Sequence, residues 1–126
     1  DSCANDGSGA NAHKDTVLVF GRSDPMTQYD FQNNVLFALE ASTGKVRWKY
    51  KVQVAVVNCT PMMLDDVVLF QSMPAMVECL WLKDGTLKWQ HKGELSPGTS
   101  GGVAVSKSLG MAFVSANRRG KRTYNF

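Results

Sequence analysis

Residues 38–48 read Ala-Leu-Glu-Ala-Ser-Thr-Gly-Lys-Val-Arg-Trp, and residues 79–89 read Cys-Leu-Trp-Leu-Lys-Asp-Gly-Thr-Leu-Lys-Trp. Each stretch contains a glycine followed four residues later by a tryptophan. The two glycines are 41 residues apart, and so are the two tryptophans. In each, a β-prone run, a glycine turn and a second run follow one another, as in a β-hairpin. A period near 40 with several short strands per unit is typical of a β-propeller blade.

The rest of the chain supports an all-β fold. Short β-prone runs separated by turn residues extend from residue 16 to about residue 114, and no stretch has helical periodicity. In residues 46–52 apolar side chains alternate with Lys and Arg, which indicates a strand with one buried face and one wet face. We therefore predict antiparallel strands near 45–52, 67–72 and 86–90.

The strand tally predicts a propeller that is incomplete. Residues 1–14 are small and polar and are expected to form a flexible lead-in. Residues 15–126 then divide into blade one (about 15–52, lacking an inner strand), blade two (about 54–92, complete) and the start of blade three (about 99–126). Since a propeller ring needs typically four to eight blades, we expect a segment of about two to three four-stranded blades. Its open edges require further blades or a partner protein.

The first stretch resembles the pyrroloquinoline-quinone (PQQ) repeat of quinoprotein alcohol dehydrogenase-like propellers, whose pattern is Ala-Leu-Asp-Ala-x-Thr-Gly-Lys-x-x-Trp. Glu40 stands where the family has Asp. The second stretch is degenerate, because Trp81 replaces the acid and Asp84 precedes the turn glycine in place of Thr. The resemblance implies that the tryptophan docks on the backbone of the next blade and that the glycine permits the turn. Trp48 and Trp89 are therefore expected to be mostly buried at equivalent places in successive blades. The repeat-motif residues are Ala38, Leu39, Glu40, Thr43, Gly44, Trp48, Asp84, Gly85 and Trp89.

Catalytic relatives with this repeat bind PQQ and calcium, and many have a disulfide between adjacent cysteines. The three cysteines here are not adjacent, and they have no metal-site spacing. Glu78 and Asp84 are formal candidates for a base or a calcium ligand, but we place both in or beside an outer-strand turn. The prediction is that this chain contributes no catalytic, cofactor-binding or metal-binding residue.

Other polar features have simpler explanations. Neither His13 nor His91 has a carboxylate or a nucleophile at a spacing typical of a catalytic pair. His91 is expected to be a surface imidazole. Ser100-Gly101-Gly102 lacks the pattern of a nucleophile elbow or a phosphate loop. The basic cluster Arg118, Arg119, Lys121 and Arg122 has no aromatic platform around it, so no nucleic-acid partner is predicted.

The net charge of +3, the 44% hydrophobic content and the absence of a long apolar run are ordinary for a globular domain without a transmembrane segment.

Whether Cys59 pairs with Cys79, and whether the sequon at Asn58 is used, both stay open. The family resemblance and a processed-looking N-terminus slightly favour a secreted, periplasmic or lumenal compartment.

The function that these observations favour is a non-catalytic scaffold or protein-interaction surface. The alternative is a fragment of a PQQ-dependent alcohol or polyvinyl-alcohol dehydrogenase whose active-site residues lie outside this chain, and a third reading is a ligand-sensing propeller. Fold does not decide among them. Under the first reading the faces near Val17, Val19, Val103, Val105 and Phe113 are expected to pack against further blades or a partner.

Overall fold

The structure is a computed structural model and describes residues 9–22, 33–73, 76–92 and 102–114. These residues form strands and turns without a helix, and none of them belongs to a helix long and apolar enough to cross a membrane. The strands are β1 (Asn11–His13), β2 (Thr16–Gly21), β3 (Asn33–Glu40), β4 (Val46–Val56), β5 (Met62–Leu64), β6 (Val67–Ser72), β7 (Met76–Trp81), β8 (Leu87–Lys92), β9 (Val103–Ser106) and β10 (Met111–Val114).

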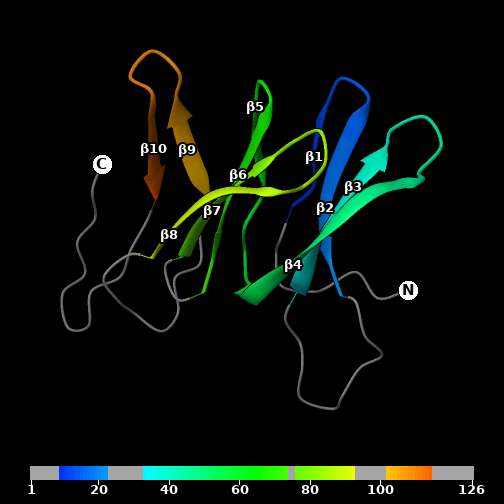
Figure 1. Cartoon of the computed structure of the whole chain (residues 1–126), viewed down its shortest axis with the longest axis horizontal. Coiled ribbons are helices and arrows are strands. Elements are labelled where there is room, and N and C mark those ends of the chain that lie inside the picture. Colours follow the sequence, from blue (N-terminus) through cyan, green and yellow to red (C-terminus); the bar gives the residue numbers. More distant parts are fainter. Residues whose placement is uncertain (1–8, 23–32, 74–75, 93–101, 115–126) are drawn as a thin grey trace.

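The strands form three antiparallel units that follow one another in chain order (Figure 1). Two are four-stranded sheets with the orders β1-β2-β3-β4 and β5-β6-β7-β8, and the third is the hairpin β9-β10. Each four-stranded sheet is a meander in which neighbouring strands pair antiparallel. The predicted all-β fold of stacked four-stranded blades is confirmed, and so are the strands expected near 45–52, 67–72 and 86–90.

The first blade has an inner strand that the sequence analysis missed. Residues 11–13, expected to lie in a flexible lead-in, form β1 and pair with β2, so blade one has four strands and begins before residue 15. At its other end, β4 continues to Val56, beyond the expected limit of 52. The Asn-Ala-His sequence of β1 carries no β-prone signal, and its order depends on its neighbours. Asn11 Nδ2 donates a hydrogen bond to the carbonyl oxygen of Pro61 at 3.0 Å, at the start of the second blade.

The two outer hairpins have the same turn. The amide of Glu40 donates to the carbonyl of Lys45 and the amide of Gly44 donates to that of Glu40, each at 2.8 Å. The same pair of bonds recurs 41 residues later in the turn that contains Gly85. Both glycines have φ of 71°, a left-handed conformation that glycine adopts without a steric penalty. The equal spacing of the repeats in sequence therefore corresponds to equal local geometry.

The main core lies between the two four-stranded sheets. It is built by apolar side chains of β2, β3 and β4 that face those of β6 and β7, and Phe20 meets Phe70 edge-on with ring centroids 5.3 Å apart. The buried members are Leu18, Phe20, Leu36, Ala38, Val52, Val56, Cys59, Val68, Phe70 and Leu80. A blade has apolar residues on both faces, so its stability depends on stacking of this kind.

A smaller core joins the second blade to the hairpin β9-β10. Leu69, Cys79 and Val103 are buried there. Val103, expected on an open face, is thus covered by the second blade, because β9 lies against β5 and β6. Phe113, on β10, has 51% of its surface exposed. On the second blade Trp89 is still 41% exposed, so the hairpin covers only part of that blade's face.

Candidate interaction site

The interface between the two blades shows how a repeat tryptophan is seated. Trp48 extends from β4 toward the second blade, where its Nε1 donates a hydrogen bond to the carbonyl oxygen of Leu82 at 2.8 Å. Its ring lies against Gly85, since a β-carbon added there would be 2.5 Å from Cε3 of Trp48. The indole thus combines one directed hydrogen bond with a large apolar contact.

A buried carboxylate forms a second polar contact across the same interface. Glu78 is 1% exposed, and its Oε2 accepts a hydrogen bond from the hydroxyl of Tyr50 at 2.7 Å. Its Oε1 accepts another from the hydroxyl of Ser72 at 2.9 Å. Burial raises the pKa of Tyr50, and the hydrogen bond to Glu78 and the charge of Glu78 raise it further. Tyr50 is therefore a neutral donor at physiological pH.

The position of Glu78 corrects the sequence analysis, which placed it in or beside an outer-strand turn. Glu78 lies within β7, paired with Phe70 on one side and Gln90 on the other. The turn begins only at Trp81, whose amide donates to the carbonyl of Thr86. The carboxylate consequently points between the blades, where a charged group is tolerated because both of its oxygens accept hydrogen bonds.

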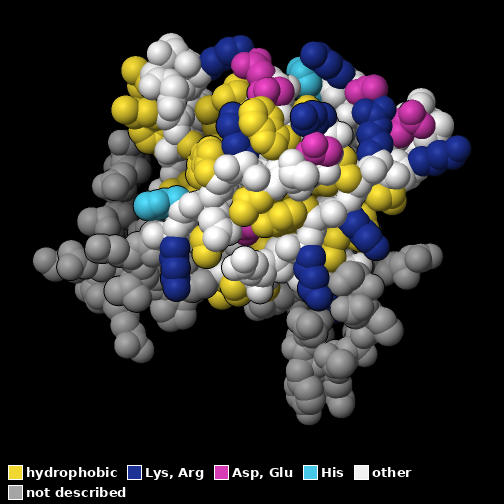
Figure 2. All heavy atoms as spheres, in the orientation of Figure 1, with side chains coloured by type: hydrophobic (Ala, Val, Ile, Leu, Met, Phe, Trp, Pro, Cys, Tyr) yellow, Lys and Arg dark blue, Asp and Glu magenta, His cyan; other side chains and the backbone are white. Residues whose placement is uncertain are grey.

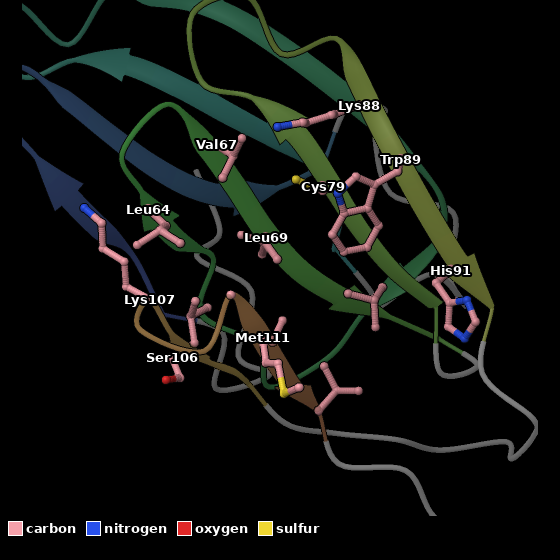
Figure 3. A pocket seen from close by; sticks show the side chains of 15 residues that line it. Leu64, Val67, Leu69, Cys79, Lys88, Trp89, His91, Ser106, Lys107 and Met111 are labelled. Atoms are coloured by element: carbon pink, nitrogen blue, oxygen red, sulfur yellow. The ribbon is translucent and has the colours of Figure 1, made fainter.

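The corresponding face of the second blade borders an open groove of about 490 Å³ (Figure 3). One wall is formed by side chains of the second sheet and the other by the hairpin β9-β10. The apolar members of the lining are Leu64, Val67, Leu69, Val77, Cys79, Trp89, Val105, Met111, Ala112 and Val114. The polar members are Lys88, His91, Ser106 and Lys107, and Gly110 completes the lining. We call this feature the Trp89 groove.

Trp89 corrects the expectation that both repeat tryptophans are mostly buried. Trp89 pairs with Cys79 as Trp48 pairs with Ala38, so the two occupy equivalent positions. Trp89 is nevertheless 41% exposed, and Figure 3 shows its indole on the wall of the groove. Among the described residues, no hairpin covers Trp89 as β7-β8 covers Trp48.

The rim of the groove is basic. Each outer hairpin has a β-bulge just before its tryptophan, so that Arg47 and Lys88 occupy equivalent positions. Arg47 is paired with Asp15 at 2.7 Å, whereas Lys88 Nζ lies 4.0 Å from the centre of the Trp81 ring. Trp81 stands at the position of Glu40, which lies 3.7 Å from Arg47, so a cation–π contact in the second hairpin replaces that ion pair of the first.

The other lysine of the rim already has an acidic partner. Lys107 Nζ lies 2.8 Å from Oδ1 of Asp65, and this contact lowers the pKa of Asp65. None of the lining side chains that belong to the described residues is acidic. Figure 2 shows that acidic side chains lie instead among the lysines and arginines along the edge that carries the strand turns. An approaching carboxylate would meet no like charge from these described side chains.

The remaining motif residues serve the turns and the core. Ala38 is fully buried in the main core, and Leu39 pairs with Val17 across β2 and β3. The hydroxyl of Thr43 donates to the carboxylate of Glu40 within the first turn. In the second turn, Asp84 Oδ1 accepts hydrogen bonds from the amide and the hydroxyl of Thr86 at 3.0 and 2.6 Å. These two bonds lower the pKa of Asp84.

The described residues do not fit a site for calcium and PQQ. Calcium takes six to eight oxygen ligands, but among these residues no three His, Cys, Asp or Glu side chains converge. The inner strands β1, β5 and β9 carry no carboxylate. Glu78 is enclosed between the blades and Asp84 is in an exposed turn.

The other polar candidates lie apart. His13 is exposed on β1, and His91 is exposed on β8 as expected. Cys59 and Cys79 are both buried thiols and do not form a disulfide with each other. The first is part of the main core and the second of the smaller one. Ser100, Gly101 and the basic cluster at 118–122 lie outside the described residues.

Two features of the site were not found from the sequence: the Tyr50–Glu78–Ser72 cluster and the Trp89 groove. One signal was present, because Tyr50 and His91 each follow a repeat tryptophan by two residues. Residues two apart on a strand point to the same face. Each blade therefore places a tryptophan and a second polar ring on the face toward the next blade.

Comparison with known proteins agrees with this architecture. The PQQ-repeat family model described as outer membrane protein assembly factor BamB matches residues 5–123. Among solved structures, the crystal structure of BamB from Moraxella catarrhalis is similar, with 19% sequence identity and a TM-score of 0.56 over 71% of this chain and 24% of that one. This likeness shows the fold, and the match spans about a quarter of that protein's length. No curated protein matches the chain significantly. Because the family model spans nearly the whole sequence, the chain belongs to the PQQ-repeat β-propeller family whose model is described as outer membrane protein assembly factor BamB.

Proposed function

We propose that this chain is a non-catalytic propeller segment that acts as a protein-interaction scaffold and binds its partner through the Trp89 groove. The observation that carries the proposal is the contrast between two equivalent tryptophans. Trp48 is seated on a neighbouring hairpin, whereas Trp89 is 41% exposed beside an apolar groove. Exposed aromatic side chains in concave apolar surfaces are typical anchors of protein interfaces.

The groove also borders a strand edge that has no partner among the described strands. The hairpin has the order β10-β9, so within the described strands β10 has a partner on one side only. In a complete blade a third strand would pair with this edge. An edge of this kind can accept an added strand, with main-chain hydrogen bonds providing affinity and side-chain pockets providing specificity.

The family supports the same function. The matched family and the similar solved structure are named for an assembly factor of outer membrane proteins. By this analogy we propose protein partners and a periplasmic location for the natural protein. No cofactor is part of the proposed function, and PQQ and calcium belong only to the alternative of a dehydrogenase fragment.

The test uses a hairpin of the kind that covers Trp48. The probe is a peptide with the sequence of residues 76–92, which form β7-β8, closed through a D-Pro-Gly linker because isolated hairpins are only marginally stable. A fluorescent label reports binding to the full chain by anisotropy. We expect saturable binding that Trp89→Ala weakens at least about tenfold.

Leu109→Ala is the matched control, because Leu109 is apolar and 64% exposed but does not line the groove. This variant should bind the probe like the parent chain. Equal binding by the Trp89→Ala variant, or no binding to the parent, would contradict the proposal.

In a parallel assay with PQQ, calcium and an artificial electron acceptor, alcohol oxidation should stay at background. Turnover that depends on both additives would instead favour the dehydrogenase alternative.

A further inference from the structure

The basic side chains of the described strands are confined to the outer strands of the two four-stranded blades. β4 carries Arg47, Lys49 and Lys51, and β8 carries Lys88 and Lys92. Neither strand contains an aspartate or a glutamate, and the other described strands contain no lysine or arginine. Both strands lie on the near side of their sheets in Figure 1, so this charge lies on the outer surface of the blades.

Three of these side chains are not held by neighbours. Arg47 forms an ion pair with an aspartate of the first blade at 2.7 Å, and Lys88 lies over a tryptophan ring. Lys49, Lys51 and Lys92 are exposed, and none of them forms an ion pair with another described residue. We call these three the outer-strand lysines. Their ammonium groups can meet a ligand without first leaving a partner among the described residues.

The exposed position recurs from one blade to the next. Lys51 pairs with Val35, and 41 residues later Lys92 pairs with Met76, so the two lysines occupy equivalent positions. Lys92 is on the side of its sheet that meets the first blade, because Glu78, two residues from Met76, contacts that blade. Lys92 is exposed although the first blade is in place. Stacking of a neighbouring blade therefore leaves a lysine at this position in contact with solvent.

The composition of the same surface suits an extended anionic ligand. Apolar side chains of β4 and β8 are exposed beside the lysines, with Val46 55%, Val54 41% and Leu87 43% accessible. Figure 2 shows lysine and arginine side chains spread between apolar ones over this near face, while most acidic side chains gather along the edge that carries the turns. Lysine is a hydrated point charge on a flexible stem, which suits many scattered phosphates better than one carboxylate of fixed geometry.

We propose that the outer surface formed by β4 and β8 binds a membrane that contains anionic lipids, with the outer-strand lysines at the phosphate headgroups. Lysines near such a surface add attraction that is largely independent of precise geometry. The proposal goes beyond the proposed function, because none of the three lysines lines the Trp89 groove. A protein partner in the groove and a membrane at the outer strands would thus use different residues.

The experiment measures cosedimentation of the full chain with vesicles of phosphatidylcholine alone and with vesicles that also contain phosphatidylglycerol. We expect binding only where phosphatidylglycerol is present, and we expect added salt to weaken it because exposed charges are screened. Each lysine near an anionic surface is worth about a factor of five in affinity. The variant Lys49→Gln/Lys51→Gln/Lys92→Gln should therefore bind about a hundredfold more weakly.

The variant Lys45→Gln/Lys83→Gln/Lys107→Gln is the matched control. It removes the same total charge, but from exposed turn residues that do not belong to the outer strands. It should bind the vesicles much as the parent chain does. Equal losses in the two glutamine variants would mean that net charge alone attracts the chain, and they would overturn the proposal.

Arginine at the three outer-strand positions should retain vesicle binding, which separates the loss of charge from a loss of packing or solubility. Lysines on outer strands also discourage sheets from pairing edge to edge. If that were their whole role, the glutamine variant would self-associate on sedimentation, and the parent chain would show no binding that depends on phosphatidylglycerol. Binding to polyglutamate in preference to the vesicles would also overturn the proposal, because it would assign the surface to an acidic protein.

Discussion

Replacing Gly85 with alanine tests the tryptophan contact most directly. Gly85 has φ of 71°, and the left-handed conformation costs a residue with a β-carbon roughly 1–2 kcal/mol. Alanine recovers about 0.5 kcal/mol of this because it restricts the unfolded chain. The backbone alone therefore predicts a loss of about 1 kcal/mol in the free energy of unfolding.

The neighbour of Gly85 adds a second cost. The new β-carbon would lie 2.5 and 2.6 Å from Cε3 and Cδ2 of Trp48, so the indole has to move. Displacing it breaks the hydrogen bond to Leu82, worth about 1 kcal/mol, and disturbs close packing for about 1 kcal/mol or more. The total expected loss for Gly85→Ala is therefore about 3 kcal/mol.

Gly44 provides a matched control within the same chain. It has the same φ of 71° and the same turn hydrogen bonds, but no atom lies within 4 Å of the position of an added β-carbon. Gly44→Ala should therefore cost only the backbone contribution of about 1 kcal/mol. The difference of about 2 kcal/mol between the two variants measures the contact with Trp48.

Urea unfolding followed by far-ultraviolet circular dichroism measures both variants without relying on tryptophan emission. The double variant Trp48→Ala/Gly85→Ala completes the test, because without the indole Gly85→Ala should cost no more than Gly44→Ala does. Equal losses for the two single glycine variants would refute the reasoning. An undiminished cost of Gly85→Ala in the Trp48→Ala background would refute it as well.

Two further predictions concern the polar and aromatic groups at the interfaces. Trp48→Ala should lower the free energy of unfolding by about 3–5 kcal/mol, as large core truncations do. Trp89→Ala should lower it by only about 1 kcal/mol, because that side chain is 41% exposed. Equal losses in urea unfolding would contradict this. Tyr50→Phe should cost about 1–3 kcal/mol, since it leaves Oε2 of the buried Glu78 without its donor. The pKa of Tyr50 is raised in the folded state, so above about pH 10 the unfolded chain loses this proton first and stability falls as pH rises. The phenylalanine variant should show a shallower alkaline loss, and an unchanged slope would argue against the Tyr50–Glu78 contact.

The sequence by itself determined the repeat and the class of fold. The 41-residue spacing of Gly44 with Gly85 and of Trp48 with Trp89 predicted two equivalent hairpins, and the structure forms both with the same turn bonds. This succeeded because turns and strand alternation depend on local chain geometry and side-chain type. The resemblance to the PQQ-repeat family was recognised from the same stretch of sequence, and the family model then matched residues 5–123.

Only the tertiary structure decided which of the equivalent residues are covered. The Tyr50–Glu78 and Trp48–Leu82 bonds join residues 28 and 34 positions apart on different blades. A period of two identifies two faces of a strand, but it does not state which neighbour meets each face. For this reason the contact of Glu78 with Tyr50 was not found from the sequence, and Trp89 was expected to be as buried as Trp48.

The inner strand β1 depended on the tertiary structure for a related reason. Its polar Asn-Ala-His sequence has no intrinsic preference for a strand, and it is ordered by pairing with β2 and by the hydrogen bond from Asn11 to Pro61 of the next blade. A strand defined by its neighbours leaves little trace in its own residues. The local pattern thus specified the outer hairpins, while stacking of the blades specified the inner strand, the buried carboxylate and the open groove.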